Sequence, residues 1–210
     1  MNLMKSMTVI LLTLLMLIGC SEVAEDSTKP REVLLQGMTM GTVAYNVKLI
    51  VKPEDSKVQG KGQFDRAEVH AEIETILKQL NQDMSNWIPD SELSRFNKST
   101  SLEPMEISSG LSRVMAESIR LGKLSGGKLD VTVGPLVNLW GFGPEQRPET
   151  VPTDEELNTA KARVGLHYLS LANNKLSKAI PNLYVDLSTI AKGYAVDLVA
   201  EAMEQRGIEN

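Results

Sequence analysis

The sequence predicts a mixed α/β ligand-binding domain behind an export signal, and three stretches carry this prediction. Residues 43–51 alternate apolar with smaller or polar residues, which is typical of a half-buried strand. From Asp65 onward, apolar residues recur at helical spacing and predict a core-facing helix. Residues 184–197 begin as an apolar, β-favouring run and continue as a helix pattern, so a strand is expected to turn into a helix there.

Length, composition and charge limit the classes of protein. The 210 residues suit one domain, or one domain and part of another, and 42% hydrophobic residues allow a sizeable core. The net charge is −5 and the basic residues are dispersed, which argues against nucleic acid as a partner. Cys20 is the one cysteine of the sequence, so an internal disulfide is excluded.

The first twenty residues have the layout of a secretory signal. Lys5 precedes an apolar run at residues 8–18, which is too short for a comfortable membrane span. Residues 17–20, Leu-Ile-Gly-Cys, resemble a bacterial lipobox, in which the cysteine becomes the lipidated first residue of the mature protein. An uncleaved N-terminal anchor helix is the alternative. Either reading places the rest of the chain outside the cytoplasm.

These features predict three segments: a lipoprotein signal peptide at 1–19, a polar tether at 20–33 that begins with lipidated Cys20, and a domain at 34–210. The expected location is the periplasm, with a lipid anchor in a bacterial membrane. Ser21 resembles outer-membrane sorting, but the inner and outer membranes both stay open.

The first part of the domain holds two candidate ligand-binding stretches. At residues 37–42, two glycines bracket Met-Thr-Met, which suits close approach of backbone to a ligand or a simple turn into the strand. Trp87 follows the predicted helix in a loop before Pro89, where it could stack on a planar ligand or plug the core. Residues 91–97 read as a surface turn, and His70 as a structural or solvated side chain.

The middle of the chain predicts short, well-marked elements. Residues 105–107 read as a strand, followed by a helix that Ser108 or Ser109 caps and that ends near Gly122. The glycine-rich residues 126–143 suit a backbone-lined pocket or a tightly packed turn. A capping box at residues 153–156 then opens a helix that is expected to end at Gly165. Residues 168–180 predict a hairpin around two asparagines, and His167 before it is expected to be structural.

Residues 184–197 hold the most chemically versatile side chains. Asp186 can hold a cation or a hydroxyl, Thr189 can cap a helix or bind a metal, and Lys192 can meet a phosphate or a carboxylate. An ordinary strand-to-helix junction with a capped helix and a solvated lysine is the alternative.

Four stretches together resemble the ApbE family, the FAD:protein FMN transferases. Their order and spacing agree with the family, and the likeness runs from about Leu34 to Asn210. The stretches are Gly-Met-Thr-Met-Gly-Thr at 37–42, the segment 84–97 with Pro-Asp-Ser-Glu-Leu-Ser-Arg-Phe-Asn, the Gly-Gly to Gly-Phe-Gly block at 126–143, and Val-Asp-Leu-Ser-Thr-Ile-Ala-Lys-Gly-Tyr-Ala-Val-Asp at 185–197.

The resemblance implies an α+β fold of the T-fold-like ApbE type, with its C-terminal portion missing from this sequence. It implies Mg²⁺-dependent transfer of FMN from FAD to a threonine or serine of a target protein, with release of AMP. The implied acceptors are subunits of NADH:quinone-type ion-pumping or related electron-transfer complexes. Many family members are periplasmic lipoproteins, which fits the lipobox.

The resemblance also assigns site residues. One set would contact FAD: Met40, Trp87, Gly127, Lys128, Leu129, Asp186 and Lys192. Thr189 would be a Mg²⁺ ligand. The family's other metal ligands and a proposed catalytic histidine lie later than Asn210, so the catalytic residues are expected beyond it and this piece alone is expected to be inactive. A non-catalytic periplasmic FAD-binding lipoprotein and a Mg²⁺-dependent FAD pyrophosphatase remain the alternatives.

Overall fold

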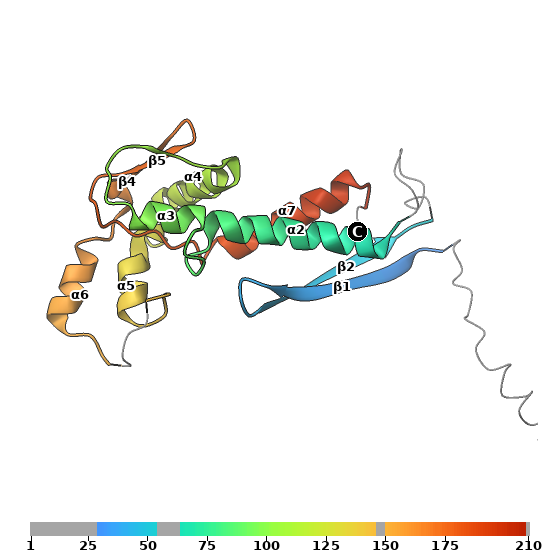
Figure 1. Cartoon of the computed structure of the whole chain (residues 1–210), viewed down its shortest axis with the longest axis horizontal. Helices are drawn as coiled ribbons and strands as arrows, with labels where there is room; N and C mark the ends of the chain where they lie inside the picture. The colour runs from blue at the N-terminus through green and yellow to red at the C-terminus, as the bar shows by residue number, and fades with distance from the viewer. Residues whose placement is uncertain (1–28, 54–63, 146–149, 209–210) are drawn as a thin grey trace, which may run out of the picture.

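The computed structural model describes residues 29–53, 64–145 and 150–208 (Figure 1). The predicted signal peptide, Cys20 and most of the tether lie outside these residues. The described elements are β1 (Arg31–Thr39), β2 (Val43–Val51), α2 (Arg66–Met84), α3 (Glu92–Lys98), β3 (Met105–Glu106), α4 (Ser109–Leu124), the 3₁₀-helix η3 (Val131–Val133), α5 (Gly134–Leu139), α6 (Asp154–Lys161), the 3₁₀-helix η4 (Leu166–Tyr168), β4 (Leu169–Ala172), β5 (Lys175–Lys178) and α7 (Ala191–Gln205).

Strands β1 and β2 form an antiparallel hairpin whose register runs from Arg31 opposite Val51 to Thr39 opposite Val43. The strand predicted at residues 43–51 is therefore confirmed. Strand β1 begins at Arg31, inside the segment that the sequence predicted as tether up to residue 33. The hairpin turn places Met40 at φ 48° and Gly41 at φ 80°.

Helix α2 is the long element against which the hairpin and α7 pack (Figure 1). Its predicted start is confirmed, because the Asp65 side chain accepts hydrogen bonds from the first turn. Five of the six predicted stripe residues are buried: Val69, Ile73, Leu77, Leu80 and Met84. Just after the C-terminal end of α7, the Arg206 guanidinium donates to the carboxylates of Glu68 and Glu72 on α2.

Residues 91–97, predicted as a surface turn, instead form most of α3, so that prediction is wrong. The Ser91 hydroxyl caps the helix by accepting from the Ser94 N–H at 3.0 Å. Leu93 and Phe96 are buried on its inner side. Burial of these two side chains stabilises a helix too short to form by itself.

The second sheet has the order β3–β5–β4, and α4 packs beside it. The predicted hairpin is confirmed, with Asn173 at φ 50° and Asn174 at φ 56° in its turn. Ser108 caps α4, which continues past the predicted end at Gly122 to Leu124. The predicted capping box also opens α6, which ends at Lys161 rather than at the predicted glycine.

The strand predicted before α7 is absent from the described residues, whereas α7 itself is confirmed. Leu183, Val185 and Leu187 are buried, and so is Asp186 between the last two. Their segment pairs with no strand of the described chain, because its backbone bonds the Asn97 side chain and the Val131 carbonyl instead. An apolar pattern indicates which side chains are buried, but it does not indicate which groups bond the backbone.

One contiguous cluster of buried side chains joins the hairpin, α2, α3, α4 and α7. Figure 1 shows α5 and α6 together at one end of the molecule, away from the hairpin. None of the helices in the described part of the chain has the length and apolarity needed to span a bilayer.

Candidate functional site

The site with the best claim to a ligand is a cavity of about 720 Å³ between the β1–β2 turn, the C-terminal end of α2 and the first turn of α7. We call it the turn cavity. It is lined by Met40, Trp87, Ser188 and Lys192, among others. Three predicted cofactor residues that lie far apart in the sequence, Met40, Trp87 and Lys192, therefore meet in one place.

Met40 reaches the turn cavity because of the geometry of the hairpin turn. Its positive φ of 48° and the bond from the Thr42 N–H to its carbonyl, at 3.1 Å, define a tight reversal. The Asn81 side chain donates to the Thr39 hydroxyl at 3.0 Å, which fixes the turn against α2. The methionine is thus held over the end of α2 and is half-buried.

Trp87 is 65% exposed, so the alternative that it plugs the core is contradicted. Its loop is nevertheless well anchored: the Trp87 N–H donates to the Ser85 hydroxyl at 3.1 Å. The Ser85 carbonyl in turn accepts from the hydroxyls of Ser91 and Ser94, at 2.5 and 3.1 Å. A flat aromatic on a fixed loop at the edge of a cavity can stack on a planar ligand.

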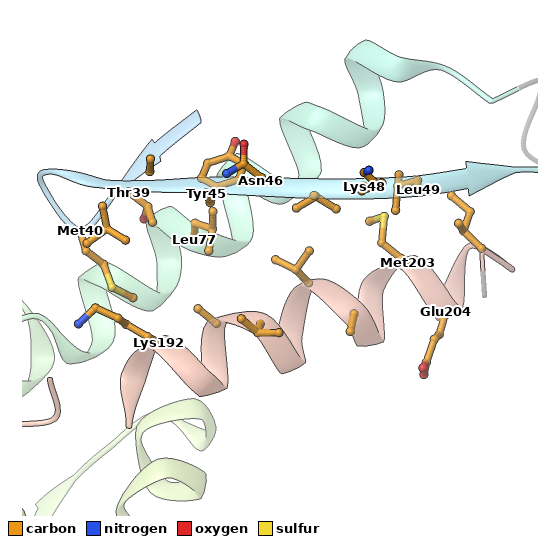
Figure 2. Close-up of a pocket in the computed structure, with 18 residues that line it drawn as sticks. Thr39, Met40, Tyr45, Asn46, Lys48, Leu49, Leu77, Lys192, Met203 and Glu204 are labelled. Atoms are coloured by element: carbon orange, nitrogen blue, oxygen red, sulfur yellow. The ribbon is translucent and has the colours of Figure 1, made fainter. Parts of the chain in front are cut away.

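Lys192 supplies the cation of the turn cavity. It lies in the first turn of α7, is exposed, and directs Nζ to 3.4 Å from the Ser188 carbonyl oxygen. In Figure 2 the Met40 and Lys192 side chains extend toward one another from the hairpin turn and from α7. A lysine beside a helix N-terminus favours an anionic group such as a phosphate.

Asp186 and Thr189 are close in the sequence to residues that line the turn cavity, but they do not line it themselves. Asp186 is buried, and its Oδ1 accepts from the Ser188 N–H at 2.8 Å. Its own N–H donates to the Val131 carbonyl at 2.7 Å. Thr189 is exposed in the turn before α7. Contacts of these two residues with FAD and Mg²⁺ therefore stay predictions.

Residues Gly127, Lys128 and Leu129 form the turn after α4 and are not among the lining residues of the turn cavity. Gly127 has φ 80° and its N–H donates to the Gly122 carbonyl at 2.9 Å, which ends the helix. The later part of the glycine-rich stretch borders a separate cavity of about 270 Å³, with Pro135 and Asn138 among its lining residues. The cofactor role of residues 127–129 also stays a prediction.

Asn97 is a positioning residue to which sequence reasoning gave no role. Its Nδ2 donates to the Val185 carbonyl at 2.9 Å, and its Oδ1 accepts from the Val185 N–H at 2.8 Å. The side chain thereby replaces a strand partner for the segment that carries Asp186. A contact between residues 88 positions apart leaves no signal in local spacing.

The two histidines lie outside the turn cavity, in agreement with the structural roles predicted for them. The Tyr45 hydroxyl and His70 Nε2 are 2.9 Å apart, and Tyr45 also donates to Glu74. Burial first, and then the hydrogen bond to the Glu74 carboxylate, raise the pKa of Tyr45. The rings of His167 and Tyr168 lie 3.9 Å apart.

The described residues fit a flavin nucleotide better than a metal ion. A cavity of this volume with one aromatic and one cation is typical of small-molecule sites. Mg²⁺ requires near-octahedral oxygen coordination, and Thr189 can offer one hydroxyl. Among the described residues, no group of three or more His, Cys, Asp or Glu side chains could hold a metal. We therefore derive no chemical step through Mg²⁺ from these residues.

The chain is similar to known proteins in sequence and in fold. A model of the ApbE family matches residues 40–210. The FAD:protein FMN transferase of Vibrio cholerae is 51% identical over 99% of this chain and 58% of its own length. The solved flavin transferase ApbE from Vibrio cholerae has a TM-score of 0.79 and 52% identity, covering 86% of this chain and 56% of that one.

The apo flavinyl transferase ApbE of Pseudomonas stutzeri has a TM-score of 0.76 and 34% identity, covering 86% of this chain and 55% of that one. The chain thus spans little more than half the length of the relatives it matches. The predicted α+β fold of the ApbE type is confirmed by these neighbours. Because the family match covers most of the sequence, the chain belongs to the ApbE family.

Proposed function

We propose that this chain forms the FAD-binding part of a protein FMN transferase. The observation that carries the proposal is the meeting of Met40, Trp87 and Lys192 in the turn cavity. It is supported by the relatives, which are named FAD:protein FMN transferases. In the proposed reaction a threonine or serine hydroxyl of the acceptor attacks the FMN phosphorus. The bond between the FMN phosphorus and the bridging oxygen breaks, AMP leaves with that oxygen, and the proton of the hydroxyl passes to water.

The lining residues would bind and orient the donor. Trp87 stacks on a flat ring of FAD, and Met40 contacts FAD from the opposite wall. Lys192 and the N-terminal end of α7 attract the pyrophosphate, whose negative charge increases as the bridge breaks. Asp186 would contact FAD through adenosine hydroxyls, in a position that Asn97 fixes through Val185.

Thr189 would supply one hydroxyl ligand to a bound Mg²⁺. The described residues do not complete such a site. We therefore propose that the chain alone binds FAD without transferring FMN at an appreciable rate. Robust Mg²⁺-dependent turnover by the purified chain with an acceptor domain would contradict this.

The cellular setting belongs to the same proposal. Lipidation at Cys20 would anchor the protein to the inner or outer membrane, with the domain in the periplasm. The acceptor would be a subunit of an NADH:quinone-type or related electron-transfer complex. Metabolic labelling with a palmitate analogue would test the anchor, because a Cys20→Ser variant must lose the label.

A non-catalytic FAD-binding lipoprotein is the second candidate, because the residues of the turn cavity could bind FAD in either protein. An FAD pyrophosphatase differs from a transferase only in its acceptor. Incubation of a longer, metal-competent form with FAD, Mg²⁺ and an acceptor domain separates the three. Covalent flavin on the acceptor indicates transfer, free FMN indicates hydrolysis, and unchanged FAD indicates storage.

The binding step has a direct test in a titration of FAD followed by flavin fluorescence. Stacking of a base on an aromatic side chain contributes about 1–3 kcal/mol, so Trp87→Ala is expected to weaken binding by roughly 5- to 150-fold. Trp140→Ala is the matched control, because Trp140 is 48% exposed and does not line the turn cavity. Equal affinities for the two variants would place FAD elsewhere.

A further inference from the structure

A separate cavity lies between α5 and α6, which Figure 1 shows at the end of the molecule away from the hairpin. We call it the α5–α6 cavity. Its volume is about 270 Å³, and it shares no lining residue with the turn cavity. Pro135, Leu139 and Ala160 form its apolar part, and all three are buried. A cavity of this size has room for a small organic molecule rather than for a single water.

The Asn138 side chain brings an unsatisfied acceptor to this cavity. Only 5% of the residue is exposed, and its Oδ1 has no hydrogen-bond partner in the described part of the chain. Gly143 lies against the same oxygen, because a Cβ at that position would overlap it. A buried amide oxygen without a donor is costly, and such groups are usually satisfied by water or by a ligand. The α5–α6 cavity therefore has a place for a hydrogen-bond donor beside Asn138.

Arg163, just after α6, brings an unsatisfied donor to the same cavity. Its Nε is buried and bonds no acceptor among the described residues. Three glutamates also line the cavity, yet Arg163 takes part in none of the ion pairs of the described chain. The edge of a guanidinium, with Nε and one Nη, offers two parallel donors that fit a carboxylate. A ligand with a carboxylate would therefore satisfy Arg163.

The three glutamates, Glu145, Glu155 and Glu156, determine which charge the rest of the ligand can carry. All three are exposed, so they lie at the solvent side of the cavity. Three carboxylates and one guanidinium give the lining a net negative charge. Such a lining attracts an ammonium group and disfavours a phosphate or another multiply charged anion. A divalent metal does not fit either, because no three acidic or histidine side chains of the described residues could hold one.

We propose that the α5–α6 cavity binds a free α-amino acid with a small apolar side chain. The α-ammonium group would donate to Asn138 Oδ1 and interact with the glutamates. The α-carboxylate would accept from Arg163, and the side chain would contact Pro135 and Leu139. A zwitterion of this kind supplies the missing donor and the missing acceptor in one small molecule, which neither a simple amine nor a simple acid does.

This site does not depend on the proposed flavin chemistry. Its lining residues are separate from those of the turn cavity, so its occupancy is tested without FAD. Tyr184 also lines the α5–α6 cavity, directly before Val185, whose backbone bonds the Asn97 side chain. A bound amino acid would therefore contact the segment that carries Asp186.

Isothermal titration calorimetry of the 210-residue chain with millimolar L-alanine, L-valine and L-leucine tests the proposal. At least one of them is expected to bind. The N-acetyl and amide derivatives of that amino acid each lack one charged end. Each derivative is expected to bind at least about tenfold more weakly, because a charge-assisted hydrogen bond is lost. Absence of binding by all three amino acids would show that the cavity holds water, and would overturn the proposal. So would equal binding of the amino acid and both derivatives.

Two variants locate the binding at this cavity. Arg163→Gln is expected to weaken binding of the amino acid at least about tenfold. Arg120→Gln is the matched control, because Arg120 is exposed, pairs with Glu117 on α4 and does not line the cavity. Equal affinities of these two variants would place the amino acid elsewhere and overturn the proposal.

Glu145→Gln provides a second test at an exposed position, where the substitution is not expected to disturb folding. It is expected to weaken binding of the amino acid, because the ammonium group loses an attractive charge. Binding of the N-acetyl derivative, which has no ammonium group, should not become weaker. An equal loss of affinity for both ligands would contradict the proposed orientation and overturn the assignment of the ammonium group to this side.

Discussion

The Asn97 side chain stabilises the segment before α7, and its removal gives the sharpest test of the structure. The amide bonds both backbone groups of Val185, at 2.8 and 2.9 Å, and Val185 is fully buried. Asn97→Ala leaves a buried N–H and a buried C=O without partners. Each such group costs about 1–3 kcal/mol, and partial access of water reduces the sum to about 2–4 kcal/mol. The melting temperature should fall by roughly 5–15 °C.

Urea unfolding followed by circular dichroism measures the loss of stability. Asn46→Ala is the matched control, because Asn46 is exposed and accepts one hydrogen bond, from Gln36 at 2.5 Å. A surface change of this kind is expected to alter the free energy of unfolding by less than about 0.5 kcal/mol. If Asn97→Ala and Asn46→Ala unfold at the same urea concentration, the bonds to Val185 do not stabilise the fold and the reasoning is refuted.

Two further predictions concern a pair of glycines and a buried lysine. A Cβ on Gly37 would lie 2.5 Å from the Tyr45 hydroxyl, so Gly37→Ala is expected to destabilise by about 1–3 kcal/mol in thermal unfolding. Gly193→Ala, which meets nothing within 4 Å inside α7, should stabilise by about 0.5–1 kcal/mol, and the same sign for both variants would contradict this. Burial lowers the pKa of Lys178 from its ordinary 10.5, so the folded state binds fewer protons than the unfolded chain between the lowered pKa and 10.5. Stability should therefore rise with pH across that window, and a Lys178→Met variant that shows the same rise in urea titrations would exclude Lys178 as its source.

The elements that the sequence predicted well are those fixed by neighbours within a few positions. The cap and stripe of α2, the two asparagines of the β4–β5 turn and the capping box of α6 each depend on residues less than about five positions apart. The geometry of these elements is determined locally, because the side chains that close the turn or cap the helix are next to it in the chain.

The elements predicted wrongly depend on distant partners. Helix α3 is stabilised by burial of Leu93 and Phe96, which a short polar-looking stretch does not reveal. The segment before α7 has an apolar, β-favouring sequence, but the Asn97 side chain takes the backbone hydrogen bonds of Val185. In both places the deciding contact comes from another part of the chain, so local propensity gave the wrong structure.

Residue types alone predicted only part of the candidate site. Cation, aromatic and glycine signals each had an ordinary structural alternative, and only the joint order of four motifs favoured a cofactor site. The structure then separates the predicted residues: Met40, Trp87 and Lys192 share the turn cavity, whereas residues 127–129 do not line it. The sequence alone does not show which of the predicted residues lie around one ligand, because packing sets the distances between them.

Helix α2 provides the common support for the three walls of the turn cavity. Its Asn81 side chain bonds Thr39 beside the hairpin turn, and the loop that carries Trp87 follows its last residue. Arg206, just after α7, bonds two carboxylates of α2. The distance between Met40 and Lys192 is thus set by how α2 packs against the hairpin and α7.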